Sequence, residues 1–207
     1  MSASSGRWAP AAVVFDCDGT LVDSATANYQ AWRDALRPAG VALDQAWYLD
    51  RTGLSATQLL DHLEAEHRRW LDRRVVHAEQ RRRYLDNLHL LAEIKAVADL
   101  ARRLHGCLPL AVASGGPRSS VEGALRHTGL LRLFDVVATS DDVTRPKPAP
   151  DLYLLATARL DVDPYHALAL DDTAEGLTAA RRAGLRTVDV RNRHALTAAS
   201  QLLQQRP

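Results

Sequence analysis

Short apolar runs alternate with helix-like stretches along most of the chain. Runs of this kind, bounded by Gly, Pro and Asp, are typical of parallel strands buried on both faces of a sheet. The predicted strands are residues 11–15, 108–113, 135–139, 167–170 and 186–190. Apolar residues at helical spacing, such as Val121 and Leu125, fill the gaps between the last four strands. This alternation predicts an α/β fold with a doubly wound parallel sheet.

One region interrupts the alternation and contains no convincing strand. A helix is expected after Ser24 as its cap, and it should stop near Pro38. A second helix is expected after Ser55, and a long Arg-rich helix is expected from His67 to Leu91. The sequence therefore predicts a helical cap domain inserted into an α/β core, with residues 24–90 in the cap and residues 1–23 and 91–207 in the core.

Composition narrows the classes of function. A chain of 207 residues can hold one domain with a sizeable insertion. Its net charge of +1 gives no reason to expect a nucleic acid or a membrane as partner. No run approaches a membrane span, and the N-terminus lacks the apolar segment of a signal peptide. Two cysteines, Cys17 and Cys107, are too few for a disulfide framework, so a cytoplasmic location is expected.

Polar side chains follow the predicted strands at the points where ligands bind in open α/β sheets. These residues are Asp16 and Asp18 after the first strand, Ser114 after the second, Lys147 after the third, and Asp171 and Asp172 after the fourth. Carboxylates gathered at one point need a cation, and hard oxygen ligands suit Mg²⁺. The sequence therefore predicts a Mg²⁺ site formed by the aspartates.

Ser114, Gly115 and Lys147 together predict a binding site for phosphate. Glycine lets backbone N–H groups approach a ligand closely, serine adds a hydroxyl donor, and lysine supplies a positive charge. Asp16 can then be a nucleophile that attacks phosphorus. Asp18 can protonate the leaving alcohol and later activate water. A free Asp titrates near ~3.9, so this role requires a raised pKa for Asp18.

Four motifs resemble those of the haloacid dehalogenase superfamily: "DCDGTLVDS", "VASGG", "RPKPAPDLY" and "LDDTAEGLTAARRAG". The helical insertion resembles the small cap of the group that contains beta-phosphoglucomutase and many sugar-phosphate phosphatases. The resemblance implies Mg²⁺, an Asp16 nucleophile and an Asp18 acid/base. It implies metal binding by Asp16, the backbone carbonyl of Asp18 and Asp172, while Asp171 is either a ligand or a neighbour of the ligands. It also favours a monomer.

The resemblance leaves the reaction open between a phosphatase and a mutase. The mutase has a His at the position of Asn28 and an Arg at the position of Ala56, so both departures favour a phosphatase. Other segments resemble phosphatases of fructose 1-phosphate or 6-phosphogluconate, which predicts a small sugar phosphate as substrate. A non-catalytic protein that binds phosphate esters is a third alternative. Substrate specificity is expected in the cap, where the candidate contacts are Asn28, Tyr29, Trp47, Tyr48 and the arginines.

Overall fold

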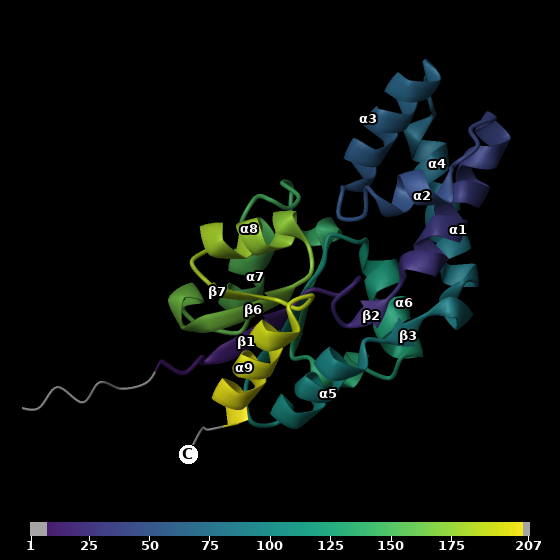
Figure 1. The fold of residues 1–207 in the computed structure, drawn as a ribbon. Coiled ribbons are helices and arrows are strands. Elements are labelled where there is room, and N and C mark those ends of the chain that lie inside the picture. Colours follow the sequence, from purple (N-terminus) through teal and green to yellow (C-terminus); the bar gives the residue numbers. More distant parts are fainter. Residues whose placement is uncertain (1–7, 205–207) are drawn as a thin grey trace, which may run out of the picture.

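A computed structural model describes residues 8–204, and its centre is a five-stranded parallel sheet with strand order β5-β4-β1-β6-β7 (Figure 1). The strands are β1 (Ala12–Phe15), β4 (Leu110–Ala113), β5 (Val136–Ala138), β6 (Ala167–Asp171) and β7 (Arg186–Asp189). All five predicted strands are present, with ends that shift by at most two residues. The prediction of a doubly wound α/β fold is confirmed.

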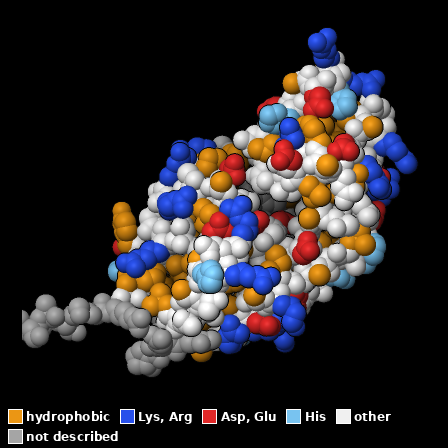
Figure 2. All heavy atoms as spheres, viewed as in Figure 1, with side chains coloured by type: hydrophobic (Ala, Val, Ile, Leu, Met, Phe, Trp, Pro, Cys, Tyr) orange, Lys and Arg blue, Asp and Glu red, His pale blue; other side chains and the backbone are white. Residues whose placement is uncertain are grey.

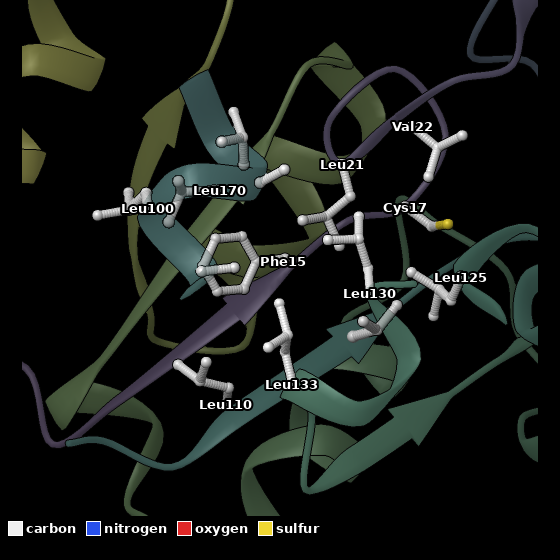
Figure 3. Packing of buried hydrophobic residues seen from close by; sticks show 14 of the residues in the cluster. Phe15, Cys17, Leu21, Val22, Leu100, Leu110, Leu125, Leu130, Leu133 and Leu170 are labelled. Atoms are coloured by element: carbon white, nitrogen blue, oxygen red, sulfur yellow. The ribbon is translucent and has the colours of Figure 1, made fainter. Parts of the chain in front are cut away.

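Helices cover both faces of this sheet because alternate residues of each strand point to opposite faces. On one face, Val13 and Phe15 of β1 pack with α5 (Lys95–Leu104), α6 (Arg118–His127) and α9 (Arg193–Gln204). On the other face, Ala12 and Val14 pack with α7 (Asp151–Arg159) and α8 (Ala174–Arg182). Figure 3 shows Phe15 among leucines from the first of these layers. The pattern of apolar residues predicted α6, α7 and α8 but missed α5 and α9.

The inserted region is helical, as predicted, and consists of α1 (Ala25–Leu36), α2 (Gln45–Leu49), α3 (Ala56–His67) and α4 (Arg73–Asp86). It has a hydrophobic cluster of its own, which includes Trp32, Leu36 and Leu60. The start of α1 and Tyr84 of α4 join the core cluster instead, so the helices stand on the core. This arrangement supports the proposed division into a core and a cap at residues 24–90.

A two-stranded antiparallel ribbon lies where the chain leaves and re-enters the core. It pairs β2 (Val22–Asp23) with β3 (Ala92–Glu93), and strands this short were not predicted from the pattern of apolar residues. The 3₁₀ turns in the part of the chain that the structure describes are Arg37–Ala39, Leu88–Leu90, Leu131–Leu133, Ser140–Asp142 and Pro164–His166. None of the helices within residues 8–204 has the length and hydropathy needed to cross a membrane.

Two predictions about the cap helices are wrong. The Arg-rich stretch from His67 to Leu91 is not one helix, because α3 ends at His67 and Arg68 turns the chain with a φ of 47°. A new helix begins after Asp72, whose carboxylate accepts the N–H of Val75. Ser24 precedes α1 as predicted, but its hydroxyl does not cap the helix, since it donates to Asp18.

Candidate active site

The predicted site residues meet at the carboxyl ends of β1, β4 and β6. A cavity of about 360 Å³ lies there, between the sheet and the cap helices. Figure 2 shows the surface hollowed between these two parts of the molecule. The core side of the cavity is lined by Asp16, Asp18, Gly19, Ser114, Gly115, Gly116, Lys147 and Asp172. Asp171 is fully buried behind this wall.

Lys147 joins two of the buried aspartates. Its ammonium nitrogen lies 2.6 Å from Oδ1 of Asp16 and 2.8 Å from Oδ2 of Asp171. The ring of Tyr153 lies 5.1 Å from the same nitrogen. Burial by itself lowers the pKa of Lys147, but the two carboxylates outweigh burial and hold that pKa well above its ordinary value. Lys147 is therefore a fixed cation directly beside Asp16.

Asp171 is saturated with hydrogen-bond donors. Its Oδ1 accepts the backbone N–H and the hydroxyl of Thr173, both at 2.8 Å. Its Oδ2 accepts the hydroxyl of Tyr153 at 2.7 Å and the ammonium of Lys147. Burial raises the pKa of Asp171, but Lys147 and the hydrogen bonds lower it further than burial raises it, so the pKa lies below its ordinary value. These contacts make Asp171 an anchor for Lys147.

Asp172 is the more open of the two neighbouring aspartates. Its Oδ1 accepts the hydroxyl of Thr20 at 2.8 Å. A Cβ atom at Gly19 would lie 2.3 Å from Oδ2, so this carboxylate reaches the chain directly after β1 only because residue 19 lacks a side chain. Burial raises the pKa of Asp172 to about 6, and the charge of Asp171 adds to the effect.

The three aspartates Asp16, Asp171 and Asp172 form a candidate metal centre. Each offers one carboxylate oxygen, and these oxygens lie within 4.8 Å of one another. Burial raises the pKa of Asp16 well above its ordinary value, and the two neighbouring carboxylates add to the rise. Lys147 offsets only one of the three negative charges. The donor set therefore fits a hard divalent cation such as Mg²⁺, which would supply the missing positive charge.

Asp18 sits in a different environment from Asp16, although they are two residues apart. Its Oδ1 accepts the hydroxyl of Ser24 at 2.5 Å, and Ser24 accepts the side-chain N–H of Asn28 at 3.2 Å. Burial raises the pKa of Asp18, and the hydrogen bond from Ser24 limits the rise. Asp18 is thus held by neutral groups from the cap, whereas Asp16 is held by a cation from the core.

The loop after β4 lines the same cavity on the side of Lys147. Ser114 is 1% exposed, and its hydroxyl oxygen accepts the N–H of Gly116 at 3.1 Å. A Cβ atom at Gly115 would meet nothing within 4 Å, so the backbone here is open to a ligand. The serine, the glycines and the lysine that were predicted as a phosphate site from separate motifs therefore lie around one cavity.

Several neighbours of these residues were missed in the sequence. Tyr153, Thr173 and Thr20 position Asp171 and Asp172. A signal for the two threonines was available, because Thr20 lies two residues after Asp18 and Thr173 directly follows Asp172, both within a motif. Of the four candidate cap contacts, Asn28 and Tyr48 line the cavity. Tyr29 and Trp47 pack instead against the cap cluster.

Comparison with known proteins gives matches that span nearly the whole chain. The family model of haloacid dehalogenase-like hydrolases matches residues 10–184. The fructose-1-phosphate phosphatase YqaB of Escherichia coli is 32% identical over 181 residues, which cover 87% of this chain and 96% of the relative. The validoxylamine A 7'-phosphate phosphatase of Streptomyces hygroscopicus is 33% identical over 196 residues, with 92% of each chain covered.

A solved structure shows a similar fold with a ligand bound. It is a variant of the protein CbbY from Rhodobacter sphaeroides in complex with xylulose-(1,5)bisphosphate. The TM-score is 0.76 and the sequences are 29% identical, with 86% of this chain and 85% of the other covered.

Proposed function

The chain belongs to the haloacid dehalogenase-like hydrolase family, and we propose on this basis that it is a Mg²⁺-dependent phosphatase of small sugar phosphates. Two relatives named as phosphatases are matched over 96% and 92% of their lengths, and the chain is a phosphoric monoester hydrolase. The single observation that carries the proposal is the position of Asp16. This carboxylate lines the cavity and lies 2.6 Å from the buried ammonium of Lys147. It also lies beside the carboxylates of Asp171 and Asp172, so the negative charge of the cluster exceeds the charge of Lys147.

In the first step of the proposed reaction, a carboxylate oxygen of Asp16 attacks the phosphorus atom of the bound ester. The bond between phosphorus and the ester oxygen breaks, and the carboxyl group of Asp18 gives its proton to the departing oxygen. The products are the free sugar and an aspartyl-phosphate at Asp16. The raised pKa of Asp18 supports this role, because a carboxyl group must hold a proton in order to donate one.

In the second step, the carboxylate of Asp18 takes a proton from a water molecule as the water oxygen attacks phosphorus. The bond between phosphorus and Asp16 breaks, so inorganic phosphate leaves and both aspartates return to their starting states. Ser114 and Lys147 would hold the phosphoryl oxygens through both steps by hydrogen bonding and charge. Asp171 contributes indirectly by holding Lys147 against Asp16.

Mg²⁺ would be held by Asp16, Asp172 and the backbone carbonyl of Asp18, and when bound it would neutralise charge on the phosphoryl group. Asp172 is the better candidate of the two neighbouring aspartates for direct contact. Both oxygens of Asp171 already accept donors from the protein, whereas only one oxygen of Asp172 does.

The size and lining of the cavity support a small polar substrate. A volume of about 360 Å³ is at the lower end of the range for small-molecule sites. Neutral hydrogen-bonding groups of Ser24, Asn28 and Gln80 line it from the cap, and such groups suit sugar hydroxyls. Two relatives act, by name, on fructose 1-phosphate and on validoxylamine A 7'-phosphate. Fructose 1-phosphate and 6-phosphogluconate are therefore the first substrates to test.

The experiment that tests this function is capture of the covalent intermediate. Enzyme mixed with a phosphate ester and Mg²⁺ is quenched in acid, and its mass is measured. The proposal expects a phosphoryl group on the peptide that contains Asp16 and none on the Asp16→Asn variant. Formation of a hexose 6-phosphate from a hexose 1-phosphate, with little free phosphate and dependence on a bisphosphate primer, would instead identify a mutase.

A further inference from the structure

The cap wall of the cavity carries a single charged side chain among the described residues, that of Arg51. The other cap residues that line the cavity, among them Asn28, Tyr48 and Gln80, are all neutral. We propose that Arg51 binds a second anionic group of the substrate, a carboxylate or a second phosphate, at the end away from the transferred phosphoryl group. The inference rests on the proposed function and narrows its substrate class.

The guanidinium of Arg51 is held in place before any ligand arrives. It lies 4.2 Å from the centre of the Trp47 ring, in a cation–π contact. One of its nitrogens donates to the backbone oxygen of Trp47 at 3.1 Å and to a carboxylate oxygen of Asp50 at 3.3 Å. A side chain fixed in this way loses less conformational entropy when it binds a ligand than a free arginine does.

The same guanidinium keeps donors available for a ligand. Within residues 8–204, both of its hydrogen bonds come from one nitrogen, and its remaining N–H groups have no protein acceptor. Its ion-pair partner Asp50 is 81% exposed, so water screens that pair and leaves the charge of Arg51 largely unbalanced. Arginine with free N–H groups matches the two oxygens of a carboxylate or phosphate.

The loop between α2 and α3 brings Arg51 over the cavity. Gly53 has a φ of +100°, and a Cβ atom there would lie 3.3 Å from Thr173 at the start of α8. The loop therefore contacts the core at Thr173, directly beside Asp172 of the candidate metal centre. Glu175 of α8 also lines the cavity, so the competing role for Arg51 is an ion pair with Glu175 that holds the cap against the core.

Two pairs of substrates test the second anion, and the pair of open-chain compounds differs in that group alone. In the first pair, 6-phosphogluconate differs from sorbitol 6-phosphate only by a carboxylate in place of a hydroxymethyl group. In the second pair, fructose 1,6-bisphosphate differs from fructose 1-phosphate by the second phosphate. The measured quantity is the ratio of kcat/KM within each pair, for the wild type and for Arg51→Gln, Arg51→Lys and Arg74→Gln. Arg74 is an exposed cap arginine outside the cavity, so Arg74→Gln is the matched control.

The wild type should favour the member that carries a second anionic group, in at least one pair, by about tenfold or more, as one charge-assisted hydrogen bond allows. A preference in the first pair alone identifies a carboxylate, and a preference in the second pair alone identifies a phosphate. Arg51→Gln should bring the ratio close to one, Arg51→Lys should retain part of it, and Arg74→Gln should retain all of it. Thermal melting of each variant checks that it is folded.

Three results would overturn the inference. The first is a wild-type ratio of kcat/KM near one in both pairs, and the second is a wild-type ratio that stays unchanged in Arg51→Gln. The third is an equal fall of kcat/KM for both members of a pair in Arg51→Gln. The last result would assign Arg51 to the contact with Glu175. If no ester is hydrolysed, the proposed function fails, and the same ratios are read from dissociation constants measured by calorimetry with the four compounds. If the ratio of dissociation constants within a pair falls in Arg51→Gln, the inference about Arg51 holds even though the protein is not a phosphatase.

Discussion

The hydroxyl of Ser24 donates a hydrogen bond to Oδ1 of Asp18, so the residue that begins the cap contacts the proposed acid–base group of the core. The bond fixes the direction in which Asp18 presents its carboxyl group. Ser24→Ala should therefore lower kcat by about tenfold with a smaller change in KM, since a misdirected proton donor affects the chemical step more than binding. Steady-state kinetics on the best substrate measures both parameters.

The control for this prediction is Ser200→Ala on α9, where the serine hydroxyl accepts only from the exposed Arg103. This variant should keep the wild-type kinetics. A Ser24→Ala enzyme with unchanged kcat would show that Asp18 needs no support from the cap.

Gly19 and Gly106 provide a second test because they share a backbone conformation but not a neighbourhood. Their φ angles are +81° and +77°, so alanine at either position costs roughly 1–2 kcal/mol of stability. A Cβ atom at residue 19 would also lie 2.3 Å from the Asp172 carboxylate, whereas nothing lies within 4 Å of one at residue 106. Gly19→Ala should therefore lose at least about tenfold in kcat/KM through displacement of Asp172, and Gly106→Ala should lose stability only.

Urea unfolding and steady-state kinetics of both variants give the two quantities. Equal activity in Gly19→Ala and Gly106→Ala would contradict the importance assigned to the position of Asp172.

Lys147 offsets charge in the aspartate cluster, and its removal should expose the repulsion among the three carboxylates. Lys147→Met should abolish measurable turnover and destabilise the metal-free protein by about 3 kcal/mol or more at neutral pH, because a buried ion pair is broken. Mg²⁺ should then raise the melting temperature of the variant more than that of the wild type, since more negative charge remains to be balanced. Thermal unfolding with EDTA and with Mg²⁺ measures both effects.

The only other lysine of the chain, Lys95, is exposed, and Lys95→Met should behave like the wild type in both conditions. If Mg²⁺ shifted the melting temperatures of all three proteins equally, the cation would not bind at the cluster beside Lys147.

Asp142 lies outside the active site and links stability to pH. Burial opposes its ionisation, but hydrogen bonds from Thr139 and Arg159 and the charge of Arg118 lower the pKa of Asp142 from 3.8 to about 2. A pKa that is lower in the folded state stabilises the protein above the unfolded value, and this stabilisation is lost as pH falls through about 2. After allowance for solvent screening, the contribution is about 1 kcal/mol.

Asp142→Asn should therefore lower the free energy of unfolding at pH 6, and its difference from the wild type should shrink between pH 4 and pH 2. Urea titrations across this range measure the difference. Asp86→Asn, which removes an exposed pair with Arg82, should cost less than about 0.5 kcal/mol. A difference for Asp142→Asn that does not change with pH would show that its ionisation contributes nothing to stability.

The parts of the fold and site that the sequence predicted are those encoded in short local patterns. Asp16, Ser114 and Asp171 each follow an apolar run directly, and parallel strands necessarily bring such residues to one edge of the sheet. Lys147 was identifiable because lysine is rare in this chain and two prolines flank it. The helical nature of the insertion was equally local, since its helices carry apolar residues at helical spacing.

The features that the sequence did not predict depend on contacts between distant residues. The ribbon pairs β2 with β3, and the whole cap lies between these two segments in the sequence. Segments of two residues are too short to show a periodic pattern. From the sequence, the side chain of Ser24 could either cap the N-terminus of α1 or contact another residue. Only the folded chain shows that its hydroxyl donates to Asp18. The choice of Tyr153 as a donor to Asp171 and of Arg51 as the charged cap residue likewise depends on how helices pack.

The most direct test of the account is phosphate release from fructose 1-phosphate and 6-phosphogluconate with Mg²⁺, measured for the wild type and for Asp16→Asn. The variant keeps the shape of the side chain but removes the charge and the nucleophilic oxygen, and its melting temperature checks that it is folded. The account predicts phosphate release by the wild type and none above background by Asp16→Asn. Release at comparable rates by both proteins would contradict it, because Asp16 would then not be the group that attacks phosphorus.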